Sequence, residues 1–122
     1  MGLQIERDEI FTSLTAARQL IDANKLRPML FLESEAMEDF SGIDLNDPPN
    51  AVVIGLAPHK FNYEHLNDAF RLLMSDERNR LIAIHKAKYF RRKDGLALGP
   101  GAFVSALEFS THKRAHIVGK PS

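Results

Sequence analysis

The fold is decided by the stretch Ala51-Val52-Val53-Ile54-Gly55-Leu56, a continuous apolar run that follows the turn-forming residues Asp47-Pro48-Pro49-Asn50. Strands that are buried on both faces of a parallel sheet have this uniformly apolar composition, without alternation. Three further runs share it: Pro28-Met29-Leu30-Phe31-Leu32, Leu81-Ile82-Ala83-Ile84 and Ala115-His116-Ile117-Val118. The sequence therefore predicts four buried strands.

Helical segments separate these strands. Thr12 or Ser13 has the chemistry to cap a helix that runs to about Asn24, and Pro100 is suited to the first position of a helix that runs to about Thr111. Two other helices are predicted over residues 34–40 and 62–75. Strands and helices that alternate in this way predict an α/β fold, with a mostly parallel four-stranded sheet and helices on both faces.

A small hairpin is predicted between the third strand and the last helix. Lys93-Asp94-Gly95 has turn chemistry, and the flanking segments 89–91 and 96–98 can pair across it, which places the hairpin at about 89–98.

Composition limits the classes of function. The 122 residues suit one domain, and no apolar run approaches the roughly 20 residues that span a bilayer. The absence of cysteine excludes disulfides, thiolate metal sites and a cysteine nucleophile, and it permits a reducing compartment, so we expect a cytoplasmic protein. Sixteen basic and 16 acidic side chains balance, so no strong attraction to nucleic acid or to an anionic membrane is expected.

The charge is unevenly distributed along the chain. Residues 1–61 hold 5 basic and 10 acidic side chains, whereas residues 62–122 hold 11 and 6. Such runs are usually solvated faces. The functional alternative is that the basic run from Lys86 to Lys93 receives an anionic ligand or an acidic patch of another chain.

Ligands of parallel α/β sheets gather at the carboxyl ends of the strands. Those ends are Glu33, Gly55-Leu56, His85-Lys86 and Gly119-Lys120. Lys120 follows a strand and a glycine and precedes a proline, so it is either a fixed positive charge for a phosphate or carboxylate, or simply a solvent-facing residue. His85 is either a ligand donor or a structural strand-end histidine.

Other candidates are weaker. Gly99-Pro100-Gly101 precedes a helix whose amide groups could receive an anion, although glycine and proline are equally ordinary at a loop end. His112 and His116 have no third metal ligand nearby in the sequence, so no metal site is expected there. Neither a nucleophile elbow nor a phosphate-binding loop is present. Composition and spacing thus indicate an anion-friendly sheet edge without a complete active site.

Several segments together resemble the cap domain of haloacid dehalogenase-superfamily phosphatases, in the NagD-like subgroup with a large inserted α/β cap. The similarity extends from about Asp8 to Pro121. The segments that carry it are Asp8–Arg18, Gly55-Leu56, Phe61–Phe70, Leu81–Lys86, Asp94–Gly101 and Val118–Pro121.

The resemblance implies a chemistry. Phosphatases of this family act on small phosphorylated metabolites with a nucleophilic aspartate, an acid–base aspartate, a serine or threonine, and acidic residues that hold Mg²⁺. Lys120 matches the family lysine that orients the nucleophile and the phosphoryl group, and is therefore the expected catalytic residue. By the same resemblance, residues 1–118 are the cap, and 119–122 begin the return to a catalytic core.

The sequence also departs from the family pattern. The nucleophile, its acid–base partner and the Mg²⁺ ligands have no counterparts in these 122 residues, so we expect the chain alone to be inactive and to hold no metal. Where many relatives have Thr-Asn-x-Asp, this chain reads Ile84-His85-Lys86-Ala87. The residues expected to contact the leaving group are His85, Lys86, Asp94, Gly99 and Gly101.

Two alternatives to a phosphatase cap remain at this point. Caps of this subgroup often pair subunits, so the chain is also a candidate for a non-catalytic module that forms homodimers. A receiver-like domain would fit the length and the order of elements. Receivers need an aspartate at the end of a middle strand, and Val52-Val53-Ile54-Gly55 offers no acid there.

Overall fold

A parallel four-stranded sheet forms the centre of the molecule. The computed structural model describes residues 7–43 and 48–118. The sheet has the order β1-β2-β3-β6, and all neighbouring strands are parallel. Its strands are β1 (Pro28–Phe31), β2 (Ala51–Ile54), β3 (Arg80–Ala83) and β6 (His116–Ile117). The predicted fold class is confirmed.

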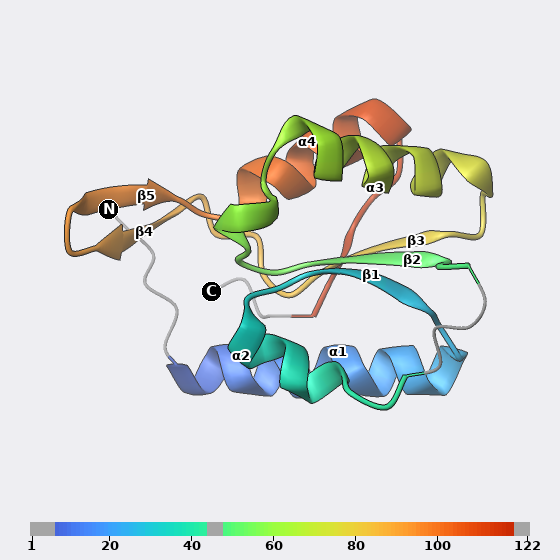
Figure 1. Ribbon diagram of the computed structural model, residues 1–122, viewed down its shortest axis with the longest axis horizontal. Coiled ribbons are helices and arrows are strands. Elements are labelled where there is room, and N and C mark those ends of the chain that lie inside the picture. Colours follow the sequence, from blue (N-terminus) through green and yellow to red (C-terminus); the bar gives the residue numbers. More distant parts are fainter. Residues whose placement is uncertain (1–6, 44–47, 119–122) are drawn as a thin grey trace.

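Helices cover both faces of this sheet (Figure 1). On one face lie α1 (Arg7–Asn24), α2 (Ser34–Met37) and the short 3-10 helix η1 (Glu38–Phe40). On the other lie α3 (Tyr63–Ser75) and α4 (Gly101–Thr111), and the 3-10 turn η2 (Pro58–Lys60) precedes α3.

Two cores result from this layering. Because side chains alternate along a strand, Val52 and Ile54 of β2 pack with Leu73 of α3, whereas Val53 packs with Ile21 of α1. All five side chains are at most 1% exposed. The continuous apolar run of β2 is therefore explained by helices on both sides.

The ends of two helices differ from the prediction. The expected cap at Thr12 or Ser13 is wrong, because α1 begins at Arg7 and both residues lie inside it. Serine and threonine also occur inside helices, where the hydroxyl group can bond to a carbonyl of the preceding turn, so their presence does not by itself fix where a helix begins. Pro100 is the N-cap of α4 and does not occupy its first helical position. The helix predicted over residues 62–75 is present as α3, and the Asn62 side chain caps it by accepting a hydrogen bond from the His65 amide at 3.0 Å.

The predicted hairpin is confirmed. Strands β4 (Tyr89–Arg92) and β5 (Gly95–Leu98) pair antiparallel, and Gly95 adopts a φ of 125° that other residues rarely reach. The hairpin projects beyond the carboxyl ends of the main strands (Figure 1). No helix in the described part of the chain is long and apolar enough to span a bilayer.

Candidate functional site

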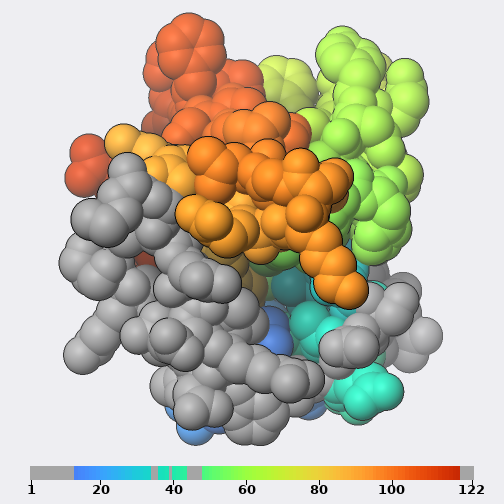
Figure 2. All heavy atoms as spheres, turned by 90° about the vertical axis from the view of Figure 1, so that its left-hand side faces the viewer, coloured from blue at the N-terminus to red at the C-terminus, as the bar shows by residue number. Residues whose placement is uncertain are grey.

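The carboxyl ends of β1, β2, β3 and β6 meet at one edge of the sheet. The hydrogen-bond ladder continues past the strands, because Gly55 donates to the Phe31 carbonyl at 2.8 Å, and Ile84 to the Ile54 carbonyl at 2.9 Å. Val118 donates to the Ala83 carbonyl at 2.9 Å. Figure 2 views the molecule from this side, where the loop and hairpin after β3 (orange) cross the middle of the surface. Lys120 lies outside the described residues.

His85 stands at this edge directly after Ile84. Its side chain is partly buried, and this loss of water lowers the pKa of the imidazole below its usual value of 6.5. The Ala87 amide approaches His85 Nδ1 at 3.4 Å and donates to it. A neutral ring that accepts at Nδ1 carries its proton on Nε2, so His85 is available as a neutral hydrogen-bond donor.

Lys86 is held by an acidic partner from α4. Its Nζ lies 2.5 Å from Glu108 Oε1, and Glu108 Oε2 accepts a hydrogen bond from the Ala115 amide at 2.8 Å. Burial acts to raise the pKa of Glu108, but the hydrogen bonds from Lys86 and Ala115 outweigh it and the pKa is lowered. The carboxylate therefore stays ionised near neutral pH and neutralises the Lys86 ammonium.

Gly99 and Gly101 bring two backbone segments into contact. The Gly99 amide donates to the Lys88 carbonyl and the Gly101 amide to the Ala87 carbonyl, both at 3.0 Å. A Cβ at Gly99 would overlap the Ala87 carbonyl, and one at Gly101 would lie 2.6 Å from the Lys86 carbonyl oxygen. Their amide hydrogens are thus used inside the protein, and a ligand contact would have to involve other atoms of these residues.

Asp94 lies at the tip of the hairpin. Arg92 donates to both of its carboxylate oxygens, at 3.1 and 2.9 Å, and these hydrogen bonds lower the pKa of Asp94. The ion-pair partner of Asp94 is thus Arg92 of the same hairpin, and not a residue at the sheet edge where His85 lies. The roles of His85, Lys86, Asp94, Gly99 and Gly101 in substrate binding remain predictions.

An aromatic stack lies behind this edge and was not predicted from the sequence. The rings of Phe61 and Phe103 are stacked with centroids 4.0 Å apart, and Phe31 stacks on Phe61 at 6.4 Å. The stack joins the end of β1, the segment after η2 and the first turn of α4. The three residues are 30 and 42 positions apart in the sequence, so no local pattern reveals their contact.

The described residues do not form a magnesium site. Among residues 7–43 and 48–118, no group of three or more histidine or carboxylate side chains is placed to share a metal ion. Mg²⁺ needs oxygen ligands in near-octahedral geometry, so the Mg²⁺ that the family resemblance implies does not fit the residues present. At this edge the structure places a neutral hydrogen-bond donor at His85 and a cation at Lys86 that is paired with Glu108.

Comparison with known proteins identifies relatives along the whole chain. The sequence is 61% identical over 121 residues to haloacid dehalogenase-like hydrolase domain-containing protein 2 of Bos taurus, covering 99% of this chain and 46% of that protein. The chain is homologous to part of a haloacid dehalogenase-like hydrolase. It is also 38% identical over 122 residues to phospholysine phosphohistidine inorganic pyrophosphate phosphatase of Danio rerio, covering 45% of that protein.

Part of the solved structures of haloacid dehalogenase-like hydrolases has the same fold as this chain. The p-nitrophenyl phosphatase from Archaeoglobus fulgidus superposes with a TM-score of 0.76 at 27% identity, over 98% of this chain and 48% of that one. No protein-family profile matches the chain. The chain thus spans slightly less than half the length of the haloacid dehalogenase-like hydrolases it matches.

Proposed function

We propose that this chain is the cap of a haloacid dehalogenase-like phosphatase and covers a phosphomonoester bound to a separate catalytic core. Residues 1–118 form the cap, and residues 119–122 begin the return to that core. The observation that carries the proposal is that the carboxyl ends of β1, β2, β3 and β6 lie at one edge of the sheet. His85 follows β3 at this edge, and Val118, which ends the described chain there, precedes Lys120 by two residues in the sequence. A cytoplasmic location is part of the proposal and rests on the absence of cysteine.

In this proposal, Lys120 is the catalytic residue that the chain contributes. Phosphoryl transfer is accelerated mainly by positioning and by cations near the developing negative charge, and a lysine ammonium is a compact positive charge suited to that task. The nucleophilic carboxylate would come from residues outside this chain, since no counterpart is present here.

His85 would contact the leaving group. A neutral imidazole that donates from Nε2 binds an ester or hydroxyl oxygen without adding charge, and the cost of desolvating a charged group is avoided. Lys86 would act less directly, because Glu108 already neutralises it. Selectivity for the leaving group would then depend on His85 and on the hairpin beside it.

The test compares the chain with a longer protein. The isolated 122 residues should not hydrolyse p-nitrophenyl phosphate in buffer with MgCl₂, whereas a full-length protein that contains them should. In that full-length protein, Lys120→Ala should lower turnover by about 10²–10³-fold, while Arg71→Ala, an exposed change on α3, should not. Turnover by the isolated chain, or an unchanged rate in Lys120→Ala, would contradict the proposal.

Exposed apolar side chains on the hairpin favour a second candidate function, homodimer formation through the cap. Leu96 and Leu98 of β5 are 66% and 64% exposed, which is unusual for leucine in a short strand. If this surface pairs two copies, Leu96→Ser/Leu98→Ser should convert a dimer to a monomer in sedimentation equilibrium. A wild-type chain that is monomeric at high concentration would exclude this candidate.

A further inference from the structure

A groove crosses the amino-terminal edge of the sheet, opposite the edge discussed so far. Its volume is about 550 Å³, and its polar lining includes Arg27, Asn50, Ser75, Asp76, Arg78 and Arg80. These residues come from the end of α3, from the turns that lead into β1, β2 and β3, and from the first residue of β3. Three arginines face a single aspartate in this lining, so the groove carries a positive charge in a chain whose net charge is zero.

The aspartate is already paired. Asp76 accepts hydrogen bonds from the Arg78 side chain at 3.2 and 2.9 Å, and the pKa of its carboxyl falls to about 2, chiefly because of these bonds. The remaining charges of the lining are those of Arg27 and Arg80. Arg27 Nε donates to the Pro48 carbonyl at 2.7 Å, which fixes the base of its guanidinium group.

Backbone contacts fix the spacing of Arg27 and Arg80. The Arg27 amide donates to Asn50 Oδ1 at 2.6 Å, Asn50 donates to the Arg27 carbonyl at 2.8 Å, and Arg80 donates to the Asn50 carbonyl at 3.3 Å. The two arginines therefore flank Asn50 across two strand spacings, which corresponds to roughly 10 Å between their backbones.

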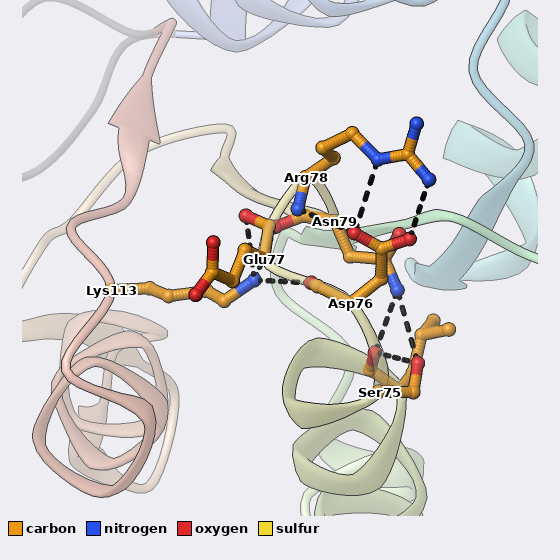
Figure 3. Close-up of polar contacts among 7 residues, drawn as sticks. Ser75, Asp76, Glu77, Arg78, Asn79 and Lys113 are labelled. Atoms are coloured by element: carbon orange, nitrogen blue, oxygen red, sulfur yellow. Dashed lines mark hydrogen bonds and ion pairs between the residues drawn. The ribbon is translucent and has the colours of Figure 1, made fainter.

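A lysine clamp makes one wall of the groove rigid (Figure 3). Lys113 Nζ donates to the carbonyl oxygens of Asp76, Glu77 and Asn79, at 2.9, 3.4 and 2.7 Å. The Asn79 side chain in turn donates to the Leu72 carbonyl at 2.8 Å and to Ser75 Oγ at 3.1 Å. The turn that carries Asp76 and Arg78 is thus held from two sides before any ligand arrives.

We propose that this groove binds a small anion with two or more linked phosphate groups. Guanidinium groups bind phosphate oxygens through paired hydrogen bonds, and a chain of linked phosphates reaches both Arg27 and Arg80, whereas one orthophosphate contacts them less completely. A preformed wall reduces the ordering cost of binding. The groove lies at the opposite edge of the sheet from His85, so this inference does not depend on the proposed function.

The test is a titration of the ¹⁵N-labelled 122-residue chain with tripolyphosphate or orthophosphate, at constant ionic strength and without divalent metal. Tripolyphosphate should give saturable shifts at the amides of Asn50, Asn79 and Arg80, and orthophosphate should bind at least about tenfold more weakly. Arg80→Gln should weaken tripolyphosphate binding about tenfold, whereas Arg71→Gln, an exposed arginine of α3, should leave it unchanged.

Three outcomes would overturn the inference: shifts that do not saturate, equal affinity for the two anions, or Arg71→Gln and Arg80→Gln with the same effect. If Arg80→Gln disturbs the spectrum outside the groove, Arg27→Gln provides the same comparison from the other side of Asn50. Unchanged affinity in a folded Arg27→Gln variant would also overturn it.

Discussion

The two edges of the sheet are built differently. At the amino edge, a short turn connects α3 to β3, and the single ammonium of Lys113 holds three of its carbonyl groups. At the carboxyl edge, a long connection between β3 and α4 includes the hairpin. The two ends of the hairpin meet where the Gly99 amide donates to the Lys88 carbonyl. This connection is held by the close approach of Gly99 and Gly101 to the backbone of Lys86 and Ala87, and by the Lys86–Glu108 ion pair.

The two edges therefore differ in what their polar and apolar groups can do. The turn at the amino edge is held by bonds within the protein, whereas the carboxyl edge has side chains that can contact another molecule. At the amino edge, Lys113, Leu72 and Ser75 take up the hydrogen bonds of the turn, so the turn is held in one conformation. The carboxyl edge instead leaves a neutral donor at His85 and exposed side chains at Leu96 and Leu98 for contact with something else. Four predictions test this comparison, from the largest expected effect to the smallest.

Gly99→Ala should be the most damaging change at the carboxyl edge. Its Cβ would overlap the Ala87 carbonyl, so backbone must move, at a cost of about 2–3 kcal/mol in the free energy of unfolding. Gly42→Ala is the control, because its surroundings are open and only its φ of 80° opposes a side chain, which costs about 1 kcal/mol. Equal urea midpoints for the two variants would contradict the packing role of Gly99.

Lys113→Met tests the clamp of the amino edge. Methionine keeps much of the side-chain volume but donates no hydrogen bond, so we expect a loss of about 1.5 kcal/mol in unfolding free energy. Amide exchange of Asn79, which donates to the Asp76 carbonyl at 3.1 Å, should accelerate. Lys93→Met at the exposed hairpin tip should change stability by less than about 0.5 kcal/mol. Unaltered exchange at Asn79 would show that the turn does not need the clamp.

Glu108→Gln removes the charge that holds Lys86. The expected loss at pH 7 is about 1 kcal/mol, because the amide oxygen still accepts from Ala115. Since the folded-state pKa of Glu108 is lowered, its contribution is present above its usual value of 4.5 and is lost as the pH falls through the folded value. Urea unfolding at pH 7 and pH 3 should therefore show a smaller difference between variant and wild type at pH 3. Glu77→Gln, an exposed change, should show no such convergence.

His85→Gln should have the smallest effect, visible as a change in pH dependence. The folded-state pKa of His85 lies below 6.5, so the unfolded chain takes up the proton first as the pH falls. Wild-type stability should therefore decrease between pH 7 and pH 5, and His85→Gln should reduce that decrease. His59→Gln, at an exposed histidine, is the control. If both variants keep the wild-type slope, His85 is not desolvated in solution.

Part of the candidate site could be predicted from the sequence and part could not. The carboxyl-edge position of His85 and Lys86 follows from the end of an apolar run and is confirmed. The engagement of Lys86 by Glu108 could not be predicted, because the partners are 22 residues apart and belong to different elements. The basic groove at the amino edge also escaped prediction, since Arg27 and Arg80 approach only after three parallel strands align.

What the sequence determined by itself was local. Apolar runs defined the four strands, the segment 62–75 was recognised as a helix, and Lys93-Asp94-Gly95 marked the hairpin turn. Periodicity and turn chemistry act over a few residues, so they can be recognised without a partner. The tertiary structure alone decided which distant groups meet: Lys113 with the turn before β3, and Phe61 with Phe103. The local cap signal at Thr12 and Ser13 did not set the start of α1, which begins at Arg7, because serine and threonine are also accommodated inside a helix.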